Sequence, residues 1–123
     1  MTTASHSQHR VLVVDDNVDG ADMLATLLHL DGIDAKAVYN GQSALAVMRE
    51  WRLTAALVDL SMPNMDGFSV AQAARKIPGC SAITLIALTG WRPDEVAARC
   101  AAAGFNGVLV KPLELEQLYR LLD

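Results

Sequence analysis

The sequence predicts a doubly wound α/β domain, in which helices cover both faces of a five-stranded parallel sheet. Short apolar runs rich in Val, Ile and Leu indicate strands that are buried on both faces. Segments with apolar residues at helical spacing alternate with these runs, as in repeated βα units. Crossovers between parallel strands are right-handed, which places helices on both sides of the sheet. By analogy with other doubly wound sheets, we expect the strand order 2-1-3-4-5.

Four of the five predicted strands are continuous apolar runs, and each run stops at a polar residue. The second predicted strand is more polar than the others and is placed by the helix stop before it and the turn after it. The predicted strands span residues 11–14, 34–38, 55–58, 83–88 and 108–110.

The first four predicted helices are each bounded by residues that begin or end helices. Gly32 and Gly104 follow the first and fourth helices as stop signals, and Pro78 follows the third. Pro93 suits the first turn of the fourth helix, where its missing N–H costs nothing. The predicted helices span residues 17–30, 41–51, 66–76, 93–103 and 114–122.

Composition and charge limit the classes of function. The chain has 123 residues, of which 52% are hydrophobic and 20% charged, as in one globular domain. Its net charge of −4 argues against direct binding to nucleic acid, which requires clustered Lys and Arg. Because no apolar stretch is long enough to span a bilayer and no signal-peptide core is found, we expect a cytoplasmic protein without a membrane partner.

The chain divides into a short leader and one domain. Residues 1–9 are small and polar and are expected to form a disordered leader, followed by a domain at residues 10–123. Cys80 and Cys100 lack the spacing of a metal site and the density of a disulfide scaffold, so we expect two free thiols.

The polar residues that end the apolar runs predict a single site. Asp15 and Asp16 follow the first run, and Asp59, Thr89 and Lys111 follow the third, fourth and fifth strands. Because parallel strands share their carboxyl edge, and open α/β sheets bind ligands there, these side chains should converge. Three carboxylates in one place raise each other's pKa or require a cation, and Mg²⁺ is the hard cation that carboxylates and phosphates share.

A magnesium ion beside a Lys suits phosphoryl transfer, because both neutralise charge on the phosphoryl oxygens. An Asp carboxylate can accept a phosphoryl group covalently. Asp59 is the best candidate acceptor, since it stands alone at its strand end opposite the acidic pair and Lys111. Thr89 can donate a hydrogen bond to a phosphoryl oxygen.

Four ordered motifs resemble the receiver domain of two-component response regulators, and the resemblance covers residues 10 to 122. They read VLVVDDN from Val11, VDLSMPNMDG from Val58, ALTG from Ala87 and VKP from Val110. The resemblance implies a flavodoxin-like (βα)5 fold and a phosphoacceptor, Asp59, whose donor is a sensor or hybrid histidine kinase or a histidine phosphotransfer protein.

The same resemblance implies roles for the remaining site residues. Asp16 and Asp59 would bind Mg²⁺ directly, Asp15 would act through water, and the backbone carbonyl of Ser61 would complete the protein ligands. The bond between Lys111 and Pro112 would be cis. Such a domain is not an enzyme with a separate substrate: it catalyses its own phosphorylation and dephosphorylation and signals to a downstream protein through contacts.

Several alternatives stay open. Asp15, Asp16 or Asn17 could cap the first helix, and Asp66 is expected to cap the third. A phosphohydrolase with an Asp nucleophile usually has a second Asp two residues later, where this chain has Ser61. An adaptor that is never phosphorylated commonly lacks one of the five site residues, and a flavin carrier needs a phosphate loop where this chain is acidic.

Two hydrophobic positions bear on signalling. Val108 stands three residues before Lys111, where many receivers have an aromatic side chain that moves with the Thr. Valine has no comparable rotamer switch, so the resemblance does not extend to signalling through the fifth strand. In this respect the chain resembles receivers attached to hybrid histidine kinases. Trp91 is expected in the loop that would move with Thr89.

Overall fold

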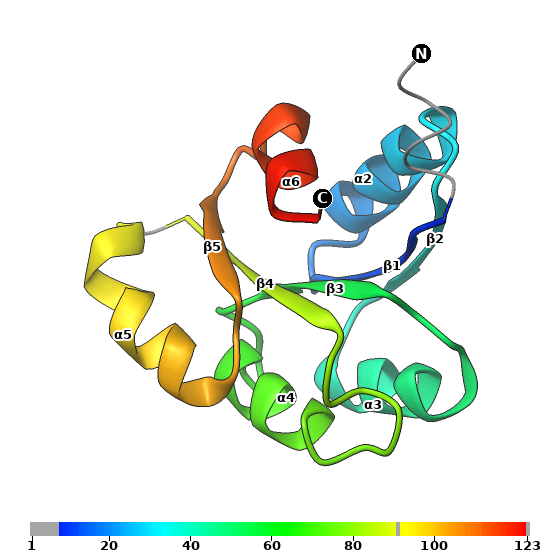
Figure 1. Cartoon of the computed structure of the whole chain (residues 1–123). Helices are drawn as coiled ribbons and strands as arrows, with labels where there is room; N and C mark the ends of the chain where they lie inside the picture. Colours follow the sequence, from blue (N-terminus) through cyan, green and yellow to red (C-terminus); the bar gives the residue numbers. More distant parts are fainter. Residues whose placement is uncertain (1–7, 91, 123) are drawn as a thin grey trace.

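A computed structural model describes residues 8–90 and 92–122 of the chain. Within these residues five strands alternate with five helices (Figure 1). The strands are β1 (Arg10–Val14), β2 (Asp34–Val38), β3 (Ala55–Asp59), β4 (Thr84–Thr89) and β5 (Gly107–Val110). The helices are α2 (Val18–Leu30), α3 (Gly41–Glu50), α4 (Gly67–Ala74), α5 (Pro93–Ala103) and α6 (Leu115–Leu122).

The five strands form one parallel sheet in the order β2-β1-β3-β4-β5, which confirms the predicted order and the doubly wound α/β fold. Strands β1, β3 and β4 lie inside the sheet and are buried along most of their length, which explains their unbroken apolar sequences. The order of the strands reverses between β1 and β3, so the ends of these two strands flank the switch point of the sheet.

Helices cover both faces of the sheet and create two separate cores (Figure 1). Helices α2 and α6 pack on one face around Leu28, Leu57 and Leu118. Helices α3, α4 and α5 pack on the other face around Leu12, Val58 and Leu85. Successive residues of a strand point to opposite faces, so Leu57 and Val58 contribute to different cores.

Three helices begin at a capping side chain. Asn17, Asn40 and Asp66 each accept a hydrogen bond from the backbone N–H three residues later, which satisfies a donor that the first helical turn leaves open. The expected cap at Asp66 is therefore confirmed. At the first helix the capping residue is Asn17, and the two preceding aspartates are left for other contacts.

Helix α4 ends at Ala74, two residues before the predicted end. The N–H groups of Lys76 and Ile77 bond to carbonyls three residues back, so the chain leaves the helix through a tighter turn. The Arg75 guanidinium then donates to backbone carbonyls of Ile83 and Gly104 and to the Asn106 side chain, which fixes the loop before β4.

Several smaller expectations can be compared with the structure. Cys80 and Cys100 are buried free thiols, as expected. No helix among the described residues is both long and apolar enough to cross a membrane. The boundary between residues 9 and 10 stays a prediction, but His9 itself is buried, with its Nδ1 3.2 Å from the Thr54 hydroxyl oxygen. Packing therefore extends at least to His9.

Candidate functional site

The carboxyl edge of the sheet brings together the polar residues that end the strands. Asp59 is the last residue of β3, Thr89 is the last residue of β4, and Asp15 follows β1 directly. Val14 pairs with Val58 and Asp59 pairs with Leu88, so the three central strands end at nearly the same level. The parallel register, rather than any local motif, places these side chains side by side.

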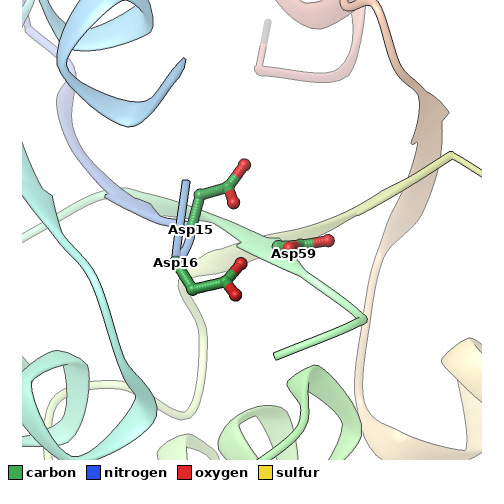
Figure 2. Close-up of side chains that lie close together, drawn as sticks. All are labelled: Asp15, Asp16 and Asp59. Carbon is green, nitrogen blue, oxygen red and sulfur yellow. The ribbon is translucent and has the colours of Figure 1, made fainter. Parts of the chain in front are cut away.

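Asp15, Asp16 and Asp59 form an acidic cluster at this edge (Figure 2). One oxygen from each carboxylate lies within 4.8 Å of the others. Asp15 and Asp59 are only 6% and 5% exposed, whereas Asp16 is exposed to solvent. Because buried like charges repel strongly, the cluster needs positive charge close by.

Lys111 supplies part of that charge. Its ammonium lies 2.8 Å from Asp15 Oδ2, to which it donates a hydrogen bond, and 3.4 Å from Asp59 Oδ1. Burial alone would lower the pKa of Lys111, but the hydrogen bond to Asp15 and the charges of both carboxylates outweigh it and raise the pKa. Lys111 is therefore a fixed cation between two of the three carboxylates.

The charged form of Asp59 is less stable than that of an ordinary exposed carboxylate. Burial and the charge of Asp15 raise the pKa of Asp59 to about 6, although the Lys111 ammonium and the Ser61 backbone N–H lower it. The Ser61 N–H lies 3.3 Å from Asp59 Oδ1. A further cation close to the Asp59 carboxylate would therefore stabilise its charged form.

The far side of the site is formed by β4 and the end of β5. Thr89 is buried, and its backbone carbonyl accepts a hydrogen bond of 2.8 Å from the Lys111 N–H. This bond ties the Lys111 backbone to the end of β4, and the following bond to Pro112 is cis, as the sequence resemblance implied. The structure thus places the side chains of Asp15, Asp16, Asp59 and Lys111 together, with the backbone of Thr89 bonded to Lys111, and the parts that these residues play stay a prediction.

The oxygen-rich cluster fits a hard divalent cation. Two carboxylates at neighbouring strand ends and a third exposed beside them offer the ligands that Mg²⁺ prefers, with solvent access for the waters it retains. When bound, such an ion would add positive charge to a cluster of three carboxylates, of which Lys111 contacts two.

Gly67 shapes the site through its backbone, a role that was not predicted from the sequence. A Cβ at this position would lie 2.6 Å from the Asp59 backbone oxygen and 2.8 Å from Leu60 Cα, so only glycine lets α4 begin this close to the end of β3. From the sequence alone, the Asp66-Gly67 pair predicts no more than the start of a helix.

Of the two hydrophobic positions that bear on signalling, Val108 lies among the described residues and Trp91 does not. Val108 is half-buried in β5, pairs with Ala87 and packs against the core that α5 covers. Trp91 lies outside the described residues, so the expected movement of its loop stays a prediction.

Comparisons with known proteins agree with this geometry. The family model of the response regulator receiver domain matches residues 11–123. An uncharacterised 14.6 kDa protein of Leptolyngbya boryana is 32% identical over 117 residues, which are 95% of this chain and 89% of that protein. Other relatives are longer: the chain covers 46% of a response regulator receiver protein of Anaeromyxobacter, to which it is 36% identical.

Solved structures show the same fold. The chemotaxis protein CheY4 of Vibrio cholerae superimposes with a TM-score of 0.87 at 30% identity, over 93% of this chain and 95% of that one. The receiver domain of the Pseudomonas aeruginosa sensor histidine kinase PA1611 has a TM-score of 0.82 at 28% identity, with 93% of each chain covered. That receiver was solved with a magnesium ion coordinated in its active-site cleft.

Proposed function

The chain belongs to the family of response regulator receiver domains, and from this premise we propose that it accepts a phosphoryl group on Asp59 from a phosphohistidine donor. The single observation that carries the proposal is the setting of Asp59. It is a buried carboxylate at the end of β3, with the Lys111 ammonium 3.4 Å from its Oδ1 and two further aspartates beside it.

Each site residue has a proposed part in the transfer. An oxygen of Asp59 attacks the phosphorus while the bond from phosphorus to the donor imidazole nitrogen breaks, which leaves an acyl phosphate on the domain and a histidine on the donor. Lys111 stabilises negative charge on the phosphoryl group, and the Thr89 hydroxyl donates a hydrogen bond to one of its oxygens. The domain thereby catalyses its own phosphorylation and later the hydrolysis of its acyl phosphate, rather than acting on a separate substrate.

The proposed metal ligands are Asp16 and Asp59 directly, Asp15 through water, and the Ser61 backbone carbonyl. Mg²⁺ held there would supply the charge neutralisation that a phosphoryl group needs beside three carboxylates. The raised pKa of Asp59 supports this part of the proposal, because Lys111 alone leaves the charge of that carboxylate only partly compensated.

The surface beside the site favours a protein donor over a small phosphate compound as the physiological partner. Met23, Leu27 and Leu30 on α2 are exposed, at 62%, 37% and 73%. A hollow of about 380 Å³ runs from Asp15 and Lys111 along this side of α2. A histidine kinase or phosphotransfer protein that covered this apolar strip would bring its phosphohistidine to Asp59.

Intact-mass measurement tests the acceptor. With Mg²⁺ and acetyl phosphate, the wild-type chain should gain one phosphoryl group and Asp59→Asn should gain none, while the control Asp94→Asn, which removes an exposed carboxylate on α5, should gain one. Equal labelling of wild type and Asp59→Asn would overturn the assignment.

A further inference from the structure

A basic trough lies along α3 and α4 and continues to the loops before β3 and β4. It consists of two adjoining hollows of about 520 and 480 Å³, which share Arg49 and Pro78. Lys76 and Gln72 of the α4 region line the first hollow, and Arg52 lines the second. The two helices that border the first hollow lie side by side under the sheet (Figure 1).

The cations of this trough differ from most others because they have no partner in the part of the chain that the structure describes. Six of the ten Lys and Arg side chains bond or stack within the described residues, namely Arg10, Lys36, Arg75, Arg92, Arg99 and Lys111. The other four, Arg49, Arg52, Lys76 and Arg120, have no ion pair, hydrogen bond or ring contact from their side chains there. Three of these four line the trough.

The trough is also a local exception to the charge of the molecule. The chain has a net charge of −4, yet the first hollow is lined by two cations and no carboxylate, and the second by a single carboxylate, Glu50. A negatively charged ligand would therefore be attracted to the trough and repelled by the net negative charge of the molecule elsewhere.

The floor of the first hollow is apolar. Ala73, Ile77 and Pro78 line this hollow together with the exposed residues Arg49 and Lys76. A free phosphate ion could use the cations but not this floor, and a nucleic acid would need a denser set of cations than an acidic protein offers. A peptide that alternates acidic and apolar side chains could pair with the two cations and also pack against the apolar residues of the hollow.

The trough lies away from the acidic cluster. Arg52 and Pro78 belong to the loops that enter β3 and β4, at the amino edge of the sheet, whereas Asp59 and Thr89 stand at the carboxyl edge. We propose that the basic trough binds an extended acidic segment of a partner protein and leaves the site at Asp59 open to a phosphoryl donor.

Fluorescence anisotropy with a labelled peptide of alternating Glu and Leu tests the proposal. Binding should be saturable, should weaken as salt is raised, and should be absent for the matched peptide of Gln and Leu. Arg49→Gln and Lys76→Gln should each weaken binding roughly twofold to fivefold. Arg120→Gln, which removes the same charge from an unpartnered cation on α6, should leave the affinity unchanged.

Two further measurements locate the bound peptide and separate the trough from the acidic cluster. Amide chemical shifts should move at residues 49–52, 72–77 and 79 and stay fixed at Thr89 and Gly90, and Asp59→Asn should bind the peptide like wild type. Equal weakening by Arg120→Gln, or shifts confined to other surfaces, would overturn the proposal. Stronger binding of a single-stranded DNA of equal charge would assign the trough to nucleic acid instead and would equally overturn it.

Discussion

At the scale of single residues, the acidic cluster is unevenly compensated. Lys111 lies close to Asp15 and Asp59, the two buried carboxylates. Asp16 is exposed and adds a third negative charge without an ion pair in the described part of the chain. Without a bound cation, the charge of Asp16 repels the two buried carboxylates.

Removing this charge should stabilise the metal-free protein and weaken metal binding. Asp16→Asn should raise the free energy of unfolding without Mg²⁺ by up to about 1 kcal/mol, and the gain in stability on adding Mg²⁺ should shrink. Thermal melts with and without Mg²⁺ measure both effects. Asp19→Asn, an equal change of charge in the first turn of α2, should not stabilise, since an acidic side chain is favourable there. If Asp16→Asn melted lower and bound Mg²⁺ as before, its role would be structural.

At the scale of elements, the start of α4 is joined closely to the end of β3. The Gly67 N–H donates to the Leu60 carbonyl, and the missing side chain lets the two backbones touch. The position of Asp59 therefore depends on a residue that has no side chain of its own.

Gly67→Ala should lower the free energy of unfolding by about 2 kcal/mol or more, because backbone atoms rather than a flexible side chain occupy the space of the new Cβ. It should also slow phosphorylation by acetyl phosphate. Gly20→Ala is the matched control: its Cβ meets nothing closer than 3.4 Å in a helix, so it should stabilise by about 0.5–1 kcal/mol. Chemical denaturation compares the two, and an unchanged stability of Gly67→Ala would show that α4 can shift.

Strand β5 offers a second prediction at this scale. Val108→Ala should cost about 1 kcal/mol, because it truncates a half-buried side chain, and should change phosphorylation little, because valine has no rotamer switch to lose. Val110→Ala, in the same strand but 39% exposed, should cost less. A large loss of phosphorylation in Val108→Ala with an unchanged melting temperature would show that this strand still takes part in the reaction.

At the scale of the whole molecule, two tyrosines bond other elements to α2, and one of them lies on α6, far along the chain. The Tyr119 hydroxyl on α6 donates to Asp31 after the end of α2, and the Tyr39 hydroxyl after β2 donates to Asp22. Burial, the hydrogen bond to Asp31 and the charge of Asp31 raise the pKa of Tyr119. The bond therefore connects the last helix to the first across one face of the sheet.

The Tyr119 bond predicts a pH dependence. Because the pKa is higher in the folded than in the unfolded chain, its contribution is complete below pH of about 10 and is lost as pH rises toward the folded pKa. Tyr119→Phe should lower the free energy of unfolding by about 1 kcal/mol at pH 8 and should lose less stability than wild type on going to strongly alkaline solution. Tyr39→Phe, at an exposed bond, should have the smaller effect. Parallel alkaline profiles of wild type and Tyr119→Phe would contradict this account.

Sequence reasoning predicted the convergence of Asp15, Asp16, Asp59, Thr89 and Lys111 because convergence requires only parallel strands with a common edge. It also predicted Asp66 as a cap, since capping depends on a few neighbouring residues. The roles of these residues in phosphoryl transfer and the limits of the domain remain predictions.

Contacts between distant segments could not be predicted in the same way. Arg75 follows a helix like any surface arginine, and nothing nearby in the sequence shows that its guanidinium will meet Gly104 and Asn106. The basic trough is similar: Arg49 lies near the end of α3, and Arg52 and Lys76 follow α3 and α4, so their adjacency depends on the packing of α3 on α4. Such features follow from tertiary packing, which leaves no period or short motif in the sequence.

The ion pair between Asp15 and Lys111 joins residues 96 positions apart. During synthesis on the ribosome, the two acidic strand ends therefore emerge long before the lysine that compensates them. Until β5 has been made and has paired with β4, the nascent chain holds its carboxylates without their own cation, and it lacks the ammonium that phosphoryl transfer is proposed to need. A partly made chain should consequently be unable to accept a phosphoryl group on Asp59, and this ability should arise late, when β5 pairs with β4.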